Sequence, residues 1–186
     1  MAEIIQEFAI ANIARVEIVT EEETPRTFRL TDVASEAEAI AYLSEGQEQI
    51  LRVKNTVKAQ NNTEDIVMGY DIRLLSATMV PHILALIDGG DLTMDVAEEN
   101  VTGYVAPVIG SPVNRIRFTT NIFTEVKDAD GSTISYVKFG YKNCSGKPVN
   151  YVLTDGEFFA PELNIKSRSK IGESPVELDF VKTLPV

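Results

Sequence analysis

A long run of alternating apolar and polar residues, followed by a short apolar segment with two glycines, occupies residues 47–90. We interpret QEQILRVKNTVKAQ as one strand, NNTE as a turn and DIVMGYDIRLLSAT as the returning strand. VPHILALIDGG then predicts a short helix that ends at the glycines. Strands average about 5–6 residues, so this ribbon is long, and such ribbons are more typical of assembling structural proteins than of small enzymes.

The two predicted strands of this ribbon each have an apolar and a polar face. We expect the apolar faces to contribute to the core, and they hold Leu51, Val53, Val57 and Ala59, then Ile66, Met68, Tyr70, Ile72 and Leu74. The charged residues of the polar faces are Arg52, Lys54, Lys58, Asp65, Asp71 and Arg73. Antiparallel pairing would place the two lysines near the two aspartates, where each opposite-charge pair contributes about 0.2–1 kcal/mol. An ordinary solvated sheet face explains the same pattern.

Length and composition predict a single soluble domain over residues 1–186. The chain is 44% hydrophobic and 24% charged, which is typical of a globular protein with a core of its own. It has no run of about 20 apolar residues that would span a membrane, and Glu3 and Glu7 stand where a signal peptide would be positive. We therefore expect synthesis in the cytosol. Cys144 is the only cysteine, so no internal disulfide is possible, and we expect it to be buried or half-buried.

The net charge of −11 is unevenly distributed along the chain. Residues 1–48 hold 11 acidic and 3 basic residues, and residues 88–112 hold 5 acidic residues and no basic one. A protein that grips nucleic acid needs Lys and Arg to neutralise phosphates, whereas the densest basic cluster here is KSRSK at 166–170. The charge pattern argues against a DNA-binding protein, although it is compatible with a conduit for DNA.

The remaining segments predict a mainly β fold. Strands are expected at 14–20, 26–31, 113–126, 133–143, 149–161 and 175–186. Ser35 and Glu38 form a capping-box pattern that predicts a short helix before Gly46. Residues 91–112 are expected to form a long, partly extended loop, and residues 1–12 an N-terminal arm. The predicted architecture is a single-domain β-sandwich or partly open barrel with one flanking α-helix.

Residue types that carry chemistry are scarce, and we predict no catalytic residue, no cofactor, no metal and no enzymatic activity. The only histidine, His82, lies at the predicted helix start, where a structural or surface role is expected. Asp128, Asp130 and Gly131 suggest a calcium loop, but the glycine stands at position 4 rather than 6, so a hairpin turn is the better interpretation. Asp88, Asp91 and Asp95 have the spacing of a cation site, which is also the spacing of a solvated acidic loop.

The succession FRLTDVASEAEA, SEGQEQILRVKNTVKAQNNTEDIVMGYDIRL and ALIDGG, within residues 28–90, resembles the major tail tube proteins of tailed bacteriophages and of related prophage or tailocin particles. The resemblance implies a β-sandwich or partly open barrel that forms hexameric rings, which stack into the hollow tube through which the genome passes. It also implies a location in the virion tail, with copies of the chain and other tail proteins as partners. DNA would pass without specific binding, and no membrane is involved.

The resemblance also suggests roles for particular residues. Arg52, Lys54, Lys58, Asp65, Asp71 and Arg73 become candidates for an inter-subunit or lumen-facing ribbon. The acids of the 91–112 loop, Asp91, Asp95, Glu98 and Glu99, become a candidate stacking loop, which we expect to be mobile, like residues 1–12, until stacking orders it. A tube lumen is expected to be acidic, so either Asp65 and Asp71 neutralise the lysines or the ribbon does not line the bore.

Two other classes of protein share the predicted features. A tail terminator or a capsid decoration protein is also rich in β-structure and free of catalytic groups, but it does not polymerise by itself. A carbohydrate-binding or adhesin sandwich is less well supported. The chain has no Trp to form a flat sugar platform, and we expect no export signal.

Overall fold

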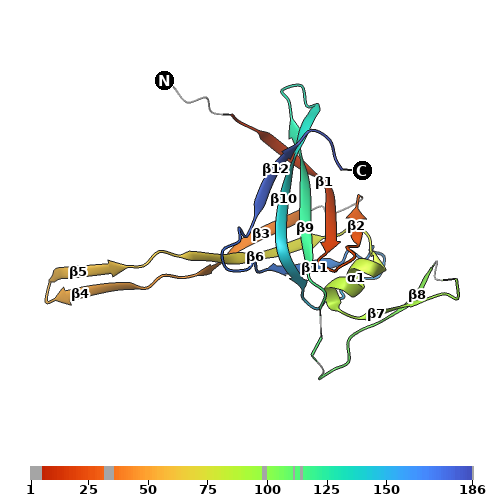
Figure 1. Cartoon of the computed structure of the whole chain (residues 1–186), viewed down its shortest axis with the longest axis horizontal. Helices are drawn as coiled ribbons and strands as arrows, with labels where there is room; N and C mark the ends of the chain where they lie inside the picture. Colours follow the sequence, from red (N-terminus) through yellow and green to blue (C-terminus); the bar gives the residue numbers. More distant parts are fainter. Residues whose placement is uncertain (1–5, 32–35, 98–99, 111, 114, 186) are drawn as a thin grey trace.

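The computed structural model describes residues 6–31, 36–97, 100–110, 112–113 and 115–185. Within these ranges the chain is mainly β-structure with one short α-helix, as the sequence predicts (Figure 1). The body is an open antiparallel sheet and not a closed barrel. Two smaller β-hairpins project from it.

The main sheet contains eight strands. Seven of them pair in the order β2 (Thr27–Leu30), β1 (Ala9–Thr20), β9 (Phe118–Lys127), β10 (Thr133–Gly146), β11 (Glu162–Ser167), β6 (Ile66–Leu75) and β3 (Glu36–Ser44). The eighth, β12 (Glu177–Val181), pairs with β10 next to the segment that pairs with β11. The order ends at the short β2 and the longer β3, and β12 is a third outer strand because it pairs with β10 alone.

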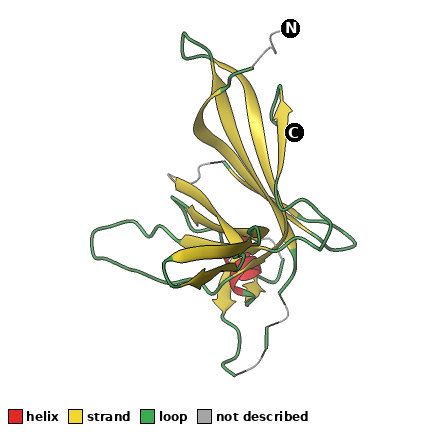
Figure 2. Ribbon diagram, turned by 90° about the vertical axis from the view of Figure 1, so that its left-hand side faces the viewer, coloured by secondary structure: helices red, strands yellow, loops and turns green. Residues whose placement is uncertain are grey.

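Helix α1 (Pro81–Asp88) packs its apolar side against the sheet. Pro81 occupies the first helical turn, where its missing N–H costs no hydrogen bond. Gly89 ends the helix in a left-handed conformation with φ 84°, and its N–H donates to the Ala85 carbonyl. Figure 2 shows the helix at one end of the sheet. The predicted helix and its stop are therefore confirmed.

The core is formed by α1 together with side chains of β1, β2, β6, β9, β10 and β11. Side chains with less than 2% exposure include Ile18, Ile72, Leu74, Ile87, Phe118 and Ile165. Each such side chain contributes about 1.5–3 kcal/mol through burial. Cys144 is buried in the same cluster, as predicted.

Two sequence predictions for this region are wrong. The helix predicted from Ser35 and Glu38 is strand β3, and Ser35 itself lies outside the described residues. Ala37 and Ala39 pack against the core while Glu36 and Glu38 are exposed, so pairing with β6 selects the period of a strand over local helix propensity. The strand predicted at 149–161 is also wrong, because the chain is irregular there and β11 begins only at Glu162.

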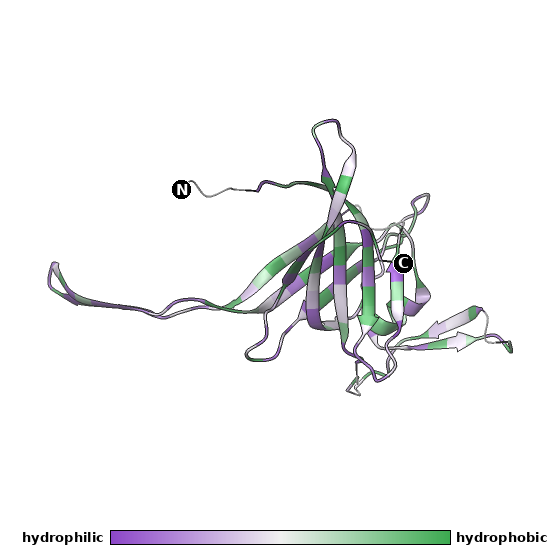
Figure 3. Ribbon diagram, turned by 45° about the horizontal axis from the view of Figure 1, so that its top comes forward, coloured by the Kyte–Doolittle hydropathy of each residue, from purple (hydrophilic) through white to green (hydrophobic). Residues whose placement is uncertain are grey.

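The long ribbon exists, but it turns at a different place. Strand β4 (Glu48–Val53) pairs with β5 (Thr56–Asn62), so the apex is Lys54–Asn55 and not the predicted turn at 61–64. Strand β6 pairs with β3 instead of with the segment 47–60. The β3–β6 pair thus continues outward as the β4–β5 hairpin (Figures 1 and 3).

The hairpin predicted around residues 127–132 is confirmed. β9 and β10 are joined by a turn in which the Asp128 N–H donates to the Ser132 carbonyl at 2.9 Å. The segment 91–112, predicted as a loop, contains a second projecting hairpin made of β7 (Asp91–Met94) and β8 (Val101–Val105). Residues 9–12 of the predicted arm belong to β1, and residues 1–5 lie outside the described part of the chain.

Candidate functional site

The most unusual surface is the β4–β5 hairpin with its connections, residues 45–65, which we call the ribbon arm. All 13 residues of its two strands are exposed, including Leu51 at 59% and Val57 at 56%. The residues from 45 to 53 extend for about 30 Å at 3.3 Å per residue. The core face predicted for Leu51, Val53, Val57 and Ala59 is therefore wrong, because no other part of the described chain covers it.

A β-bulge gives the ribbon arm apolar residues on both faces. Leu51 lies opposite Ala59, but Arg52 lies opposite Val57, so Lys58 is the extra residue. Directly opposite residues share a face, and Val57 therefore lies with Arg52 and not with Leu51. Alternation alone predicts the contrary, since it does not reveal the bulge. Both faces and both edges of the hairpin remain available to a partner.

The six charged residues predicted for one face of the ribbon divide into two groups. Arg52, Lys54 and Lys58 lie in the ribbon arm near its apex, with Lys54 in the turn at φ 52°. Asp65 lies at its base, where its carboxylate accepts the Gly46 N–H at 2.8 Å. The predicted proximity of Lys54 and Lys58 to Asp65 and Asp71 is wrong.

Asp71 and Arg73 belong to the body and not to the arm. Asp71 forms an ion pair with Arg168 at 2.8 Å, and Arg168 also donates to the Tyr70 carbonyl at 3.0 Å. Arg73 forms ion pairs with Glu36 at 3.0 Å and with Glu162 at 2.9 Å. These pairs link β6 to its two neighbours.

Polar contacts hold the base of the ribbon arm. The Gln47 N–H donates to the Thr63 hydroxyl at 2.7 Å, and that hydroxyl donates to the Gln47 carbonyl at 3.0 Å. A Cβ at Gly46 would lie 1.8 Å from the Thr63 carbonyl oxygen, so the two strands approach too closely there for any side chain. Further into the body, on β3, the Arg168 guanidinium stacks on the Tyr42 ring, 4.1 Å from its centroid.

The β7–β8 hairpin projects from the C-terminal end of the helix. The Tyr104 hydroxyl donates to the Asp88 carboxylate, which also accepts the Val149 N–H at 3.4 Å. Burial, together with this hydrogen bond to a carboxylate, raises the pKa of Tyr104 above its usual value. A Cβ at Gly90 would lie 2.4 Å from the Val105 carbonyl oxygen. In the ALIDGG motif, Gly89 thus ends the helix and Gly90 allows β8 to approach the backbone closely.

The four acids of the candidate stacking loop have different environments. Asp91 is exposed at the start of β7, opposite Val105. Asp95 closes the hairpin, because its carboxylate accepts the Asn100 side-chain amide at 2.9 Å. Glu98 and Glu99 lie outside the described residues. Among the residues with described positions, no group of three or more His, Cys, Asp or Glu side chains has the geometry of a metal site.

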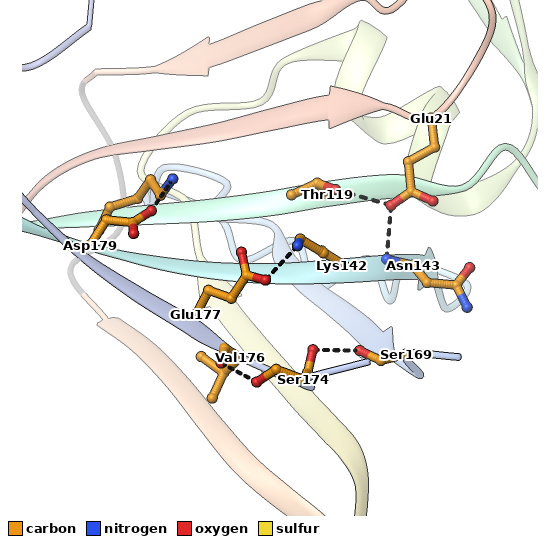
Figure 4. Close-up of polar contacts among 10 residues, drawn as sticks. Glu21, Thr119, Lys142, Asn143, Ser169, Ser174, Val176, Glu177 and Asp179 are labelled. Carbon is orange, nitrogen blue, oxygen red and sulfur yellow. Dashed lines mark hydrogen bonds and ion pairs between the residues drawn. The ribbon is translucent and has the colours of Figure 1, made fainter. Parts of the chain in front are cut away.

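Strand β12 forms another exposed apolar surface, which the sequence does not single out. Leu178 and Phe180 are half exposed, and Phe180 stacks on Phe8 with ring centroids 4.5 Å apart. Two ion pairs hold the strand to β10, Lys142–Glu177 and Lys138–Asp179, each at 2.5 Å (Figure 4).

The β10 strand is also fixed at its other edge. The Glu21 carboxylate accepts the Thr119 hydroxyl at 3.0 Å and the Asn143 N–H at 2.8 Å (Figure 4). Asn143 has φ 50° and lies at the irregularity between Tyr141 and Cys144 in the pairing with β9. This carboxylate therefore stabilises the point where β10 leaves regular pairing with β9.

The remaining sequence candidates form no combined site. His82 is exposed and lies against Phe28, with ring centroids 6.3 Å apart. The Asp130 carboxylate accepts the Ser132 hydroxyl at 2.5 Å and the Ser132 N–H at 2.9 Å, and these two hydrogen bonds lower its pKa and fit the hairpin-turn interpretation. No helix among the residues placed by the structure is long and apolar enough to cross a membrane.

No protein-family model matches the chain, and no curated protein matches its sequence. Among solved structures, a chain of the "anti-feeding prophage (AFP) baseplate, 6-fold symmetrised", determined by cryo-EM, is similar to this one with a TM-score of 0.37 and 8% identity. The alignment covers 96% of this chain and 97% of that chain. A likeness this loose decides neither fold nor function.

Proposed function

We propose that the chain is a non-enzymatic structural subunit of a phage-like tail, which associates with copies of itself into hexameric rings that stack into a tail tube. The observation that carries the proposal is the ribbon arm, which exposes apolar residues on both faces and has no covering element among the described residues. The resemblance of residues 28–90 to tail tube proteins supplies the kind of assembly.

Physical considerations support self-association. Large apolar surfaces on soluble proteins mark interaction sites, and a two-stranded hairpin alone is marginally stable in water. The unpaired edges of β4 and β5 invite strand addition from another chain. The outer edge of β3 is a further free edge, nine residues long. Packing against further copies would cover these surfaces and edges.

Electron microscopy of the purified chain tests this function. Negative-stain images at increasing concentration should show rings of six subunits and then tubes, with matching species in sedimentation velocity. Rings that never stack would favour a tail terminator, and binding only to a pre-formed lattice would favour a capsid decoration protein. A chain that stays monomeric at millimolar concentration would refute the proposal.

Removal of the ribbon arm provides a matched variant. Replacing residues 49–61 by a two-residue turn should leave the core intact, since none of the removed side chains contributes to it. We expect unchanged thermal unfolding of the body together with loss of ring or tube formation. Normal assembly of this variant would show that the arm is dispensable and would remove the main support for the proposal.

DNA binding gives a separate test. With 28 acidic and 17 basic residues, the assembled protein should have no measurable affinity for duplex DNA at physiological salt. A conduit that attracted phosphates would hold the genome in place. Submicromolar, salt-sensitive binding would contradict a passive conduit and favour a nucleic-acid-binding function.

A further inference from the structure

The two projecting hairpins differ in charge. Residues 50–60, around the apex of the ribbon arm, contain Arg52, Lys54 and Lys58 and no acidic residue. Residues 91–105, which comprise β7, β8 and the segment between them, contain four acidic residues and no basic one. In a chain of net charge −11, the apex of the ribbon arm is therefore a local exception, whereas the four acids of the arm, Glu45, Glu48, Glu64 and Asp65, lie toward its base.

The hairpins also lie at opposite ends of the molecule. The ribbon arm extends from one end of the body and β7–β8 from the other, in two different views (Figures 1 and 3). Both carry exposed apolar residues beside their charges, such as Leu51 and Val57 in the ribbon arm and Val105 in β8. On β8, Val105 lies directly opposite the exposed Asp91, so an apolar and an acidic group share one face.

We infer that the ribbon arm of one copy docks on the β7–β8 hairpin of a second copy. The basic residues of the arm would face the acidic hairpin, and the apolar residues on each would pack together. The inference rests on the proposed self-association, for which it names the two contacting surfaces. Complementary charge gives such a contact its orientation, and apolar burial gives it much of its stability.

The geometry makes this contact head-to-tail. A hairpin at one end of the first copy meets a different hairpin at the far end of the second, so the two surfaces in contact are not equivalent. Such a heterologous contact leaves one arm and one acidic hairpin free at the ends of every open oligomer. Association therefore continues until a ring closes or a filament grows.

Two charge-reversed variants test the contact. Variant A carries Arg52→Glu and Lys58→Glu, and variant B carries Asp91→Lys and Thr93→Lys, all at exposed positions. Variant A has two acidic hairpins, and variant B places two lysines on the exposed face of β7 that the basic apex of the arm would meet, so we expect the self-association of each variant to weaken about tenfold or more. In an equimolar mixture, the acidic arm of A meets the two introduced lysines on β7 of B, and the basic apex of B meets the acidic hairpin of A. Association should return to near the wild-type level.

Lys170→Glu with Lys182→Glu is the matched control, because it makes the same charge change as variant A at exposed positions outside both hairpins. Sedimentation equilibrium measures association, and circular dichroism confirms that each variant is folded. If wild type assembles and variant A assembles equally well, the contact is wrong while the proposed function stands. If wild type remains monomeric, both fail. If A and B each lose association and the mixture does not restore it, or if Arg52 and Lys58 prove to bind duplex DNA, the pairing of these hairpins is refuted.

Discussion

Removing one hydroxyl, with Tyr104→Phe, should loosen the β7–β8 hairpin from the helix. Asp88 is 7% exposed at the C-terminal end of α1, where a carboxylate is disfavoured by the helix dipole. The Tyr104 hydroxyl is the main side-chain donor to the Asp88 carboxylate, and the other hydrogen bond to it, from the Val149 N–H, is long at 3.4 Å. A hydrogen bond to a charged group contributes about 1.5–3 kcal/mol. Because Tyr104 is half-buried, we expect a loss near the lower limit, about 1.5 kcal/mol, or about 3–6 °C in Tm for a domain of this size.

The same variant should change the dependence of stability on pH. Burial and the hydrogen bond to Asp88 raise the pKa of Tyr104 in the folded chain. The folded state therefore keeps a proton that the unfolded state begins to lose near pH 10. This contribution to stability is complete below about pH 10 and is lost as the pH rises through the folded pKa. Tyr104→Phe should show a shallower fall in stability above pH 10 than wild type.

Urea unfolding at pH 7 and at several values above pH 9.5, with hydrogen exchange of the β7 and β8 amides, measures both effects. Thr102→Val is the matched control, since it removes an exposed hydroxyl from the same hairpin that donates only to the Thr93 carbonyl, at 3.1 Å. We expect it to cost less than about 0.5 kcal/mol. If the two variants have equal stability, equal pH slopes and equal exchange, the Tyr104–Asp88 contact does not anchor the hairpin.

Three further outcomes are expected. Gly90→Ala should destabilise the chain by about 1–3 kcal/mol in urea unfolding, because its Cβ would lie 2.4 Å from a carbonyl oxygen. Gly103→Ala is the control and should be nearly neutral, because its Cβ would lie 3.5 Å from the nearest atom. Equal costs for the two variants would contradict this reasoning. Burial raises the pKa of Cys144 to about 11, so iodoacetamide at pH 7.5 should modify this thiol only after unfolding. Mass spectrometry measures the modification, and a rapid reaction of the folded chain would show that the site opens. Arg168→Lys should cost about 1 kcal/mol in thermal unfolding, because lysine cannot donate to the Tyr70 carbonyl and the Asp71 carboxylate at once as the guanidinium does. Lys170→Ala, at a nearby exposed position, serves as the control, and an equal effect of the two variants would rule out a specific role for Arg168.

The sequence predicts elements whose boundaries are set locally. Pro81 and Gly89 fix both ends of the helix, and the turn at 127–132 fixes the β9–β10 hairpin. In both cases the deciding residues lie within the element or directly beside it. Patterns of three to six residues are sufficient to read such features.

Pairing between distant strands is not determined locally, and the errors arise there. The polar run at 61–64 has turn composition, but Asn61 and Asn62 are still paired with Gln49 and Glu48 in the hairpin. The segment EAEAIA is compatible with a helix until β6 is available as a partner. The bulge at Lys58 depends on cross-strand register, so the face occupied by Val57 cannot be deduced from alternation. The alternation therefore predicts one face for the candidate ribbon residues, although the fold divides them between the arm and the body.

The junction of the ribbon arm with the body has a mechanical consequence. Only the two segments that continue β3 and β6 cross it, and an irregularity between Tyr42 and Leu43 interrupts the pairing of β3 with β6 close to it. The arm behaves as a lever about 30 Å long, so a rotation of about 10° at the junction moves its apex by about 5 Å. A body held by such levers can tilt relative to its neighbours while the apex of each arm keeps the same contacts. Bending of an assembly would then occur at the junctions and leave the docked surfaces intact.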